Sequence, residues 1–184
     1  MSRRVFVGIS IPQEIMEECM NIQAKLSDLS ILFIPPADIH LTLLPPWAMI
    51  NQSLIEEKVR TALRHTERFS LHLEHLALGP NAMKPRFIWI VCSASEELVK
   101  LKKALLTAFN ISDHIPFIPH LTLARFSQED GKRLKHQPIK KPLKLSMPVA
   151  SVELFESPHQ GGSGYKILAS IPIPIPFHGS AFSH

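Results

Sequence analysis

The chain has 184 residues, of which 45% are hydrophobic and 20% charged, so it can bury a sizeable core and does not have the composition of a disordered protein. Its formal net charge of +4 suits an anionic substrate. This charge falls short of the dense basic segments of architectural nucleic-acid binders, and that class is excluded.

Strand and helix patterns alternate along the first half of the chain. Residues 4–11 (RVFVGISI) are rich in β-branched and aromatic residues and precede a proline, which predicts a buried strand. Apolar residues at helical intervals predict a helix over 13–29. A strand over 38–44 and a helix over 52–65, with Ser53 near its start, are expected next. Two further strand patterns cover 70–78 and 86–92.

The second half continues with a helix pattern over 93–109, for which Ser95 or Ser93 is the expected N-cap. Strands are predicted over 120–125, 149–156 and 165–171, the last two joined by a glycine-containing loop. The alternating prolines from Ile171 to Pro176 cannot donate ladder hydrogen bonds, so residues 172–184 are expected to form an extended tail. Together these elements predict an α+β protein with antiparallel sheets.

Other features of the chain point to no further kind of site. Cys19 and Cys92 lie far apart and form no Cys-x-x-Cys pair, so we expect two small buried or half-buried hydrophobes and no zinc site or disulfide. The basic residues between Lys132 and Lys144 could flank a phosphate groove or form a solvated surface loop. No signal-peptide pattern and no apolar run of transmembrane length occurs. We therefore expect a cytoplasmic monomer that does not enter a membrane.

The most informative feature is a repeated tetrapeptide. His-Leu-Thr-Leu occurs at 40–43 and again at 120–123, and each copy follows a proline-containing loop. The repeat predicts one bilobal domain over 1–184, with one motif in each of two similar lobes that are related by a pseudo-twofold axis around a central cleft. On a strand, His and Thr share one face while the two Leu residues share the other, which can anchor in the core.

Two such strands place the residues for acid-base chemistry at phosphorus. Histidine titrates near neutrality, so His40 and His120 can act as acid and base on a phosphodiester without a metal or a cofactor. The hydroxyls of Thr42 and Thr122 can hydrogen-bond phosphate oxygens, and Arg125 can add a charge-assisted contact. In an unbroken strand Arg125 would face away from His120, so a bulge or the end of the strand is needed to turn it inward.

The remaining histidines are weaker candidates. His72 and His75 are three residues apart in a predicted strand, which places them on opposite faces and makes a metal pair unfavourable. The other six lie in predicted loops, helix ends or the tail: His65, His114, His136, His159, His178 and His184. No spacing of His, Asp and Glu resembles a metal site, and no Gly-x-Ser-x-Gly elbow suggests a serine nucleophile.

These motifs resemble those of the two-histidine (2H) phosphoesterases, within them the LigT-like RNA 2',3'-cyclic phosphodiesterases, also described as 2'-5' RNA ligases. The segments PADIHLTL at 36–43 and FIPHLTLAR at 117–125 are similar to the two family motifs. The opening strand at 4–12, PRFIWI at 85–90 and the closing hairpin at 152–157 with Gly164 and Tyr165 also resemble the family.

The resemblance implies a bilobal α+β fold and metal-free hydrolysis of a 2',3'-cyclic phosphate on RNA or a nucleotide to a 2'-phosphate. It also implies that His40 donates the proton to the leaving 3'-oxygen and that His120 activates water, while Thr42, Thr122 and Arg125 hold the phosphate. The same residues could instead act as a 2'-5' ligase, or form a non-catalytic site that binds RNA or a nucleotide.

One segment departs from the family pattern. The family usually continues its first motif with Phe-Leu-Gly, whereas this chain has Leu44, Pro45, Pro46 and Trp47. Substrate preference is therefore less determined than reaction type. Trp47 could stack on a base, although burial as a core aromatic is the expected outcome.

Overall fold

A computed structural model describes residues 3–27, 29, 31–112, 115–136, 139–158 and 162–175. Among these residues the α-helices are α1 (Gln13–Ala24), α2 (Gln52–Leu63), α3 (Glu96–Phe109) and α4 (Gln128–Leu134), with a 3-10 turn at η1 (Pro36–Asp38). The strands are β1 (Arg4–Ser10), β2 (Leu32–Phe33), β3 (His40–Ala48), β4 (Phe69–Gly79), β5 (Phe87–Cys92), β6 (His120–Arg125), β7 (Pro142–Val149), β8 (Ser151–Ser157) and β9 (Lys166–Pro172). The mixture confirms the predicted α+β class.

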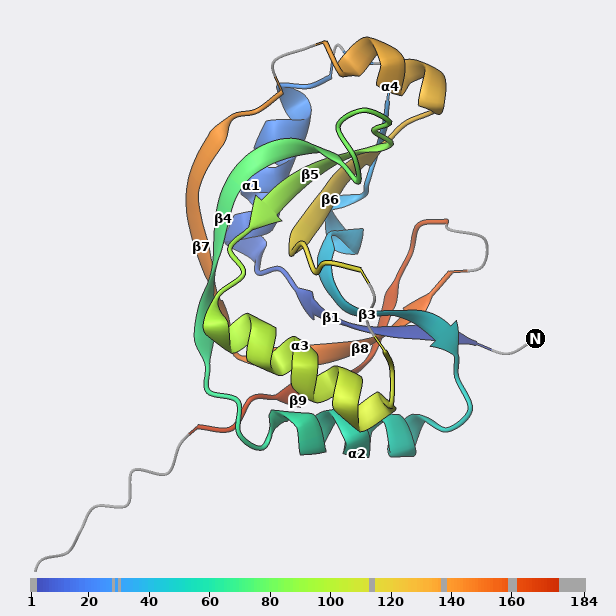
Figure 1. Cartoon of the computed structure of the whole chain (residues 1–184), viewed down its shortest axis with the longest axis vertical. Coiled ribbons are helices and arrows are strands. Elements are labelled where there is room, and N and C mark those ends of the chain that lie inside the picture. The colour runs from blue at the N-terminus through green and yellow to red at the C-terminus, as the bar shows by residue number, and fades with distance from the viewer. Residues whose placement is uncertain are drawn as a thin grey trace, which may run out of the picture.

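The strands form a sheet with the order β7-β4-β5-β6-β3-β1-β8-β9, and β2 pairs with β6 beside this path. Every pairing is antiparallel. The two motif strands β3 and β6 meet in the middle, where the register joins them at Leu41 and Leu121. Each half of this order contains four strands, of which the motif strand is the innermost, and Figure 1 shows the two groups diverging from this junction. Each motif therefore lies at the inner edge of one half of the sheet.

The helices lie mainly on one or the other half of the sheet. In Figure 1, α2 and α3 lie together at the end of the molecule that holds β8 and β9, whereas α1 lies along the half that contains β4 and β7. Helix α3 contacts β3 and β4, and α2 contacts both α3 and β9. Helix α1 follows β1 in the chain but covers the opposite half, and α3 follows β5 and does the same in reverse. The two halves are thus tied together by crossing helices.

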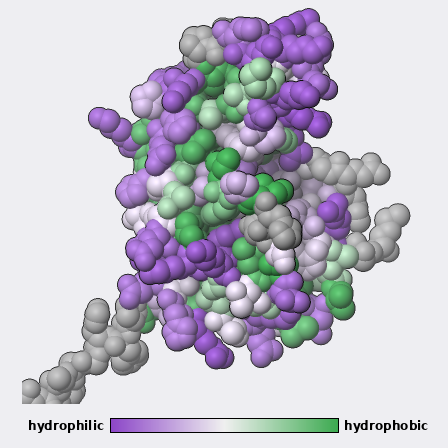
Figure 2. All heavy atoms as spheres, in the orientation of Figure 1, coloured by the Kyte–Doolittle hydropathy of each residue, from purple (hydrophilic) through white to green (hydrophobic). Residues whose placement is uncertain are grey.

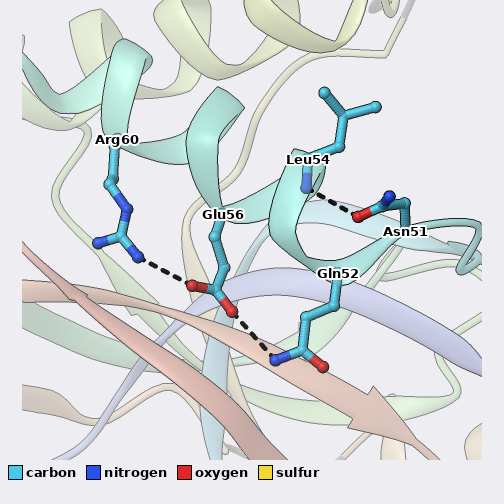
Figure 3. Close-up of polar contacts among 5 residues, drawn as sticks. All are labelled: Asn51, Gln52, Leu54, Glu56 and Arg60. Carbon is cyan, nitrogen blue, oxygen red and sulfur yellow. Dashed lines mark hydrogen bonds and ion pairs between the residues drawn. The ribbon is translucent and has the colours of Figure 1, made fainter.

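Local sequence signals explain where the helices begin. The Asn51 side chain accepts a hydrogen bond from the backbone N–H of Leu54 and caps α2, as Figure 3 shows. Within the same helix, Glu56 accepts from Gln52 and pairs with Arg60 (Figure 3). Asn51, one residue outside the predicted helix, is therefore the cap. For α3, Ser95 caps the N-terminus, which confirms one of the two serines proposed from the sequence.

Some predicted boundaries were wrong. Helix α1 ends at Ala24 rather than at residue 29, and Asp38 belongs to the turn η1 rather than to a strand. Strand β3 continues through Pro45 and Pro46 to Ala48, beyond the predicted end at residue 44. The prolines are tolerated because β6 pairs only near the start of β3 and the register with β1 skips both positions.

The basic stretch from Lys132 to Lys144 is also more ordered than a loop. It includes the end of α4 and the start of β7, an edge strand whose prolines and lysines obscured its pattern. Cys19 and Cys92 are both buried free thiols, as predicted, and burial raises the pKa of each to about 12. These thiols therefore pack as small apolar groups.

At the C-terminal end, β9 includes Pro172, and the backbone N–H of Ile173 still donates to the carbonyl of Ala150. The predicted tail thus starts within paired backbone, and its residues 176–184 lie outside the described part of the chain. His114, His159, His178 and His184 lie outside it as well. In the described part, no helix has the length and apolar character that crossing a membrane requires. On the face drawn in Figure 2, hydrophilic residues lie mostly around the outline and apolar areas lie through the middle.

Candidate active site

A pocket of about 210 Å³ opens where β3 and β6 meet. All five residues proposed from the sequence line it: His40, Thr42, His120, Thr122 and Arg125. The other lining residues are Phe6, Ile34, Asp38, Pro46, Phe87 and Tyr165. The structure therefore brings together, in one pocket, two motifs that are eighty residues apart in the sequence.

Strand alternation positions the motif side chains as predicted. In both strands the histidine and the threonine are half-buried, whereas the leucines between and after them are fully buried. The pairing of Leu41 with Leu121 places the two leucine faces in the same core. His40 and His120 therefore share the pocket face of the sheet at equivalent positions.

Each imidazole is held by a hydrogen bond to the backbone carbonyl of the residue two positions before it. Nδ1 of His40 lies 2.7 Å from the carbonyl oxygen of Asp38, and Nδ1 of His120 lies 2.7 Å from the carbonyl oxygen of Ile118. A carbonyl can only accept, so Nδ1 carries the proton in each ring. The Nε2 atom of each neutral ring is then a lone-pair acceptor, and in the charged ring it is a donor.

Aromatic rings support each histidine, but in different ways. The His120 ring stacks on Trp89, with centroids 3.7 Å apart and planes 21° apart. The His40 ring lies 4.6 Å from Phe6 and meets Tyr165 edge to face at 5.0 Å. These contacts restrict rotation of both imidazole rings.

Burial lowers the pKa of both histidines from the ordinary value of 6.5. For His40 the nearby charges of Arg125 and His120 lower it further, while the hydrogen bond to Asp38 and the Asp38 carboxylate oppose the shift. For His120 the hydrogen bond to the carbonyl of Ile118 opposes it. The two sites thus differ because His40 has a buried carboxylate beside it.

A β-bulge resolves how Arg125 reaches the pocket. On β5, Ile88 pairs with Ala124 and the next residue, Trp89, pairs with Thr122, so Leu123 is an extra residue in β6. Leu123 and Ala124 are both fully buried, which breaks the alternation and reverses the facing of the next residue. Arg125 consequently lines the pocket with His120 and Thr122. The bulge turns it inward, which is one of the two possibilities that the sequence left open.

The first motif contains the same bulge. Val7 on β1 pairs with Leu44 while Gly8 pairs with Thr42, which leaves Leu43 as the extra residue. A Cβ on Gly8 would lie 2.6 Å from the carbonyl oxygen of Leu41, so only glycine permits this close approach of the two strands. The position that matches Arg125 by the eighty-residue offset is Pro45. The pocket therefore has its arginine on one side only.

Two polar residues of the pocket were missed by sequence reasoning. Asp38 is 5% exposed, and its carboxylate accepts hydrogen bonds from the backbone N–H groups of Gly164 and Tyr165. Tyr165, the only tyrosine of the chain, accepts a hydrogen bond from Arg125 through its hydroxyl at 3.4 Å. An acid two residues before a motif histidine was the available signal for Asp38. Tyr165 had been noted only as part of the closing hairpin.

Other residues considered from the sequence lie elsewhere. Trp47 packs against Phe109 of α3, with centroids 5.4 Å apart, and does not line the pocket, so it is a partly buried core aromatic as expected. His72 and His75 lie on β4, also away from the pocket. None of the described residues from Lys132 to Lys144 lines the pocket.

Comparison with known proteins identifies the family. The family profile described as the 2'-5' RNA ligase superfamily matches residues 16–160, which is most of the chain. The chain belongs to the 2'-5' RNA ligase superfamily. Curated relatives include proteins named RNA 2',3'-cyclic phosphodiesterase, so the two-histidine resemblance read from the motifs is confirmed.

The relatives are distant, but the alignments span most of each relative's length. The protein of Methanocaldococcus jannaschii is 25% identical over 136 residues, which span 71% of this chain and 75% of the relative. The protein of Methanothermobacter thermautotrophicus is 26% identical over 132 residues, which span 68% and 72% respectively. Both are named RNA 2',3'-cyclic phosphodiesterase.

Solved structures share the superfamily fold over nearly the whole chain. A protein of Thermus thermophilus aligns with a TM-score of 0.72 at 24% identity and covers 92% of this chain and 97% of its own. LigT of Escherichia coli, solved with 3'-AMP, aligns with a TM-score of 0.71 at 23% identity and covers 94% and 99%. These structural alignments establish the LigT-like fold.

Proposed function

We propose that this protein hydrolyses the 2',3'-cyclic phosphate of an RNA end or a nucleotide to a 2'-phosphate. The observation that carries the proposal is the equivalent placement of His40 and His120, each held through Nδ1 and each lining one pocket with a threonine. The names of relatives that are 25–26% identical support the same reaction.

In the proposed reaction, neutral His120 accepts a proton from water through Nε2 as the water oxygen bonds to phosphorus. The bond between phosphorus and the 3'-oxygen breaks, and protonated His40 donates its Nε2 proton to that oxygen. The products are a free 3'-hydroxyl and a 2'-phosphate. The two proton transfers balance, so after turnover the protons return to their starting places by exchange with solvent.

The assignment of His40 as acid and His120 as base follows the order of the two family motifs. The Asp38 carboxylate favours the charged form of His40, whereas burial and the charges of Arg125 and His120 oppose it. Burial also lowers the pKa of His120.

The remaining pocket residues would hold the phosphate. Thr42 and Thr122 can donate hydroxyl hydrogen bonds to non-bridging oxygens, and the Arg125 guanidinium can neutralise charge that develops in the transition state. Because both proton transfers come from imidazoles, the reaction needs no metal-bound hydroxide and no cofactor.

The test is incubation of the purified protein in EDTA with a 2',3'-cyclic nucleotide and with an RNA that ends in a cyclic phosphate. Product analysis by 31P NMR is expected to give the 2'-phosphate. A parallel reaction with a 5'-hydroxyl RNA separates hydrolysis from ligation, because a 2'-5' joined product would assign the ligase reaction. Tight binding without turnover would instead assign a receptor.

A further inference from the structure

Each bulge in the motif strands is bonded by a buried polar side chain from a crossing helix. Nε2 of Gln23 on α1 donates to the carbonyl oxygen of Leu123 at 3.0 Å and to that of Ile34 at 2.8 Å. Nζ of Lys102 on α3 donates to the carbonyl oxygen of Leu43 at 2.7 Å. Leu43 and Leu123 are the extra residues of the two bulges. Two different side chains thus bond the same backbone atom of the repeat.

Gln23 occupies a position where an aliphatic residue would be expected. It is 9% exposed on α1, whose other buried residues are Ile15, Cys19 and Ile22. Burying an amide is unfavourable unless its polar atoms are bonded, and here both N–H donors of Nε2 are directed at carbonyl oxygens. The glutamine therefore has a specific role in joining the helix to the bulge.

The bonded segment leads directly to the pocket. The carbonyl of Leu123 also accepts the backbone N–H of Ile34 at 2.8 Å, so it receives two donors from two segments. Ile34 itself lines the pocket, and Arg125 follows Leu123 by two residues. Without the bulge, strand parity would turn Arg125 away from His120.

We propose that Gln23 is a positioning residue that keeps Arg125 in the pocket by holding the β6 bulge. Gln23 does not line the pocket and acts only through the backbone of Leu123 and Ile34. The expected effect on turnover rests on the proposed phosphodiesterase function, whereas the placement of Arg125 by Gln23 does not depend on it. Lys102 bonds the matching bulge in β3, where Pro45 stands at the position that corresponds to Arg125.

The experiment compares Gln23→Met, Arg125→Ala and the double variant with the unaltered protein. The matched control is Gln13→Met, the same substitution on an exposed residue of the same helix whose side chain donates to Glu17. Affinity for inorganic phosphate is measured by calorimetry, turnover of a 2',3'-cyclic nucleotide by kcat and KM, and folding by urea denaturation.

Gln23→Met is expected to weaken phosphate binding and to lower kcat/KM by about 10-fold to 100-fold, the range for a displaced catalytic group. In the Arg125→Ala background the same substitution should change either quantity by less than about twofold, because the group it positions is gone. Gln13→Met should leave both unchanged. An equal loss in both backgrounds would overturn the proposal, and so would wild-type phosphate affinity in Gln23→Met.

Two further outcomes need separate treatment: absence of hydrolysis, and failure of the Gln23→Met variant to fold. If the unaltered protein binds phosphate but does not hydrolyse the cyclic nucleotide, the proposed function is wrong. The phosphate affinities of the Gln23 variants still test whether Gln23 positions Arg125. If Gln23→Met does not fold, NMR on the unaltered protein decides. Phosphate is then expected to shift the Gln23 side-chain amide signal and not that of Gln13. An unshifted Gln23 signal would overturn the proposal.

Discussion

The carboxylate of Asp38 accepts a 2.9 Å hydrogen bond from the backbone N–H of Tyr165, whose ring meets the edge of the His40 ring. The same aspartate accepts the Nδ1–H of His40 through its own carbonyl oxygen. Asp38 therefore holds both the His40 imidazole and the aromatic residue beside it. It also joins the first motif to the start of β9, more than 120 residues away.

Asp38→Asn is the first test of this arrangement. The amide that replaces the carboxylate would have one acceptor oxygen for two backbone N–H donors and would direct its own N–H₂ group at one of them. Leaving a buried donor unsatisfied costs about 1–3 kcal/mol of unfolding free energy. We also expect lower turnover, because the backbone N–H groups of Gly164 and Tyr165 lose an acceptor and His40 loses the carboxylate that favours its charged form. Urea denaturation and kcat measure the two effects.

The control for this substitution is Glu129→Gln, which alters an exposed acid that pairs with Lys132 on α4. A surface change of this kind is expected to stay within about 0.5 kcal/mol. If Asp38→Asn behaves like the control in both measurements, the carboxylate has no organising role at the site.

Loss of either motif histidine is expected to lower turnover much more than binding. His40→Ala and His120→Ala should each reduce kcat by roughly 10²-fold to 10⁴-fold, the range for one general acid or base. A non-hydrolysable nucleotide should keep most of its affinity, because Thr42, Thr122 and Arg125 remain. The loss of kcat in the double variant should be much smaller than the product of the two single losses. Near wild-type turnover in either single variant would refute the acid-base pair.

The pH dependence follows from the direction of the two pKa shifts. Burial lowers the pKa of His40 and His120 below 6.5, so both rings of the free protein are mostly neutral at pH 7. Because one ring must start protonated, kcat/KM is expected to form a bell with its maximum on the acidic side of neutrality. A bound phosphate favours the imidazolium form, so the alkaline limb of the kcat profile should lie at higher pH than that of the kcat/KM profile. A steady rise to high pH would exclude this pair.

Gly79 provides a test of the support behind His120. A Cβ at this position would lie 2.4 Å from the ring of Trp89, the residue on which His120 stacks. Gly79→Ala must therefore displace the indole, and about tenfold or greater loss of kcat is expected if His120 moves with it. Gly164→Ala does not serve as a control because of its positive φ, so Ala82→Gly in the exposed β4–β5 connection is used. Unchanged kcat in Gly79→Ala would show that the stacking is dispensable.

Activity is expected to survive removal of divalent metals. Two imidazoles supply both proton transfers, so EDTA should leave kcat unchanged within about twofold. The measurement is turnover of a 2',3'-cyclic nucleotide after dialysis against chelator, with and without added Mg²⁺, Mn²⁺ or Zn²⁺. Loss of turnover that one of these ions restores would require a different mechanism.

Four of the pocket residues could be predicted from the sequence because their placement depends on local geometry. A strand of alternating residues puts His and Thr on one face and Leu on the other, and this holds for His40, Thr42, His120 and Thr122. The same local rules located most helices and strands to within a few residues. The repeat of identical motifs then indicated that two such faces meet.

The tertiary structure decided what depends on contacts between distant segments. Arg125 enters the pocket because of a bulge that Gln23 bonds from a hundred residues away, and strand parity alone predicts the opposite face. Asp38 became part of the site through backbone N–H groups of Gly164 and Tyr165, for which no local pattern exists. Alternation is a property of neighbouring residues, whereas a bulge or a buried carboxylate is stable only when remote partners satisfy its hydrogen bonds.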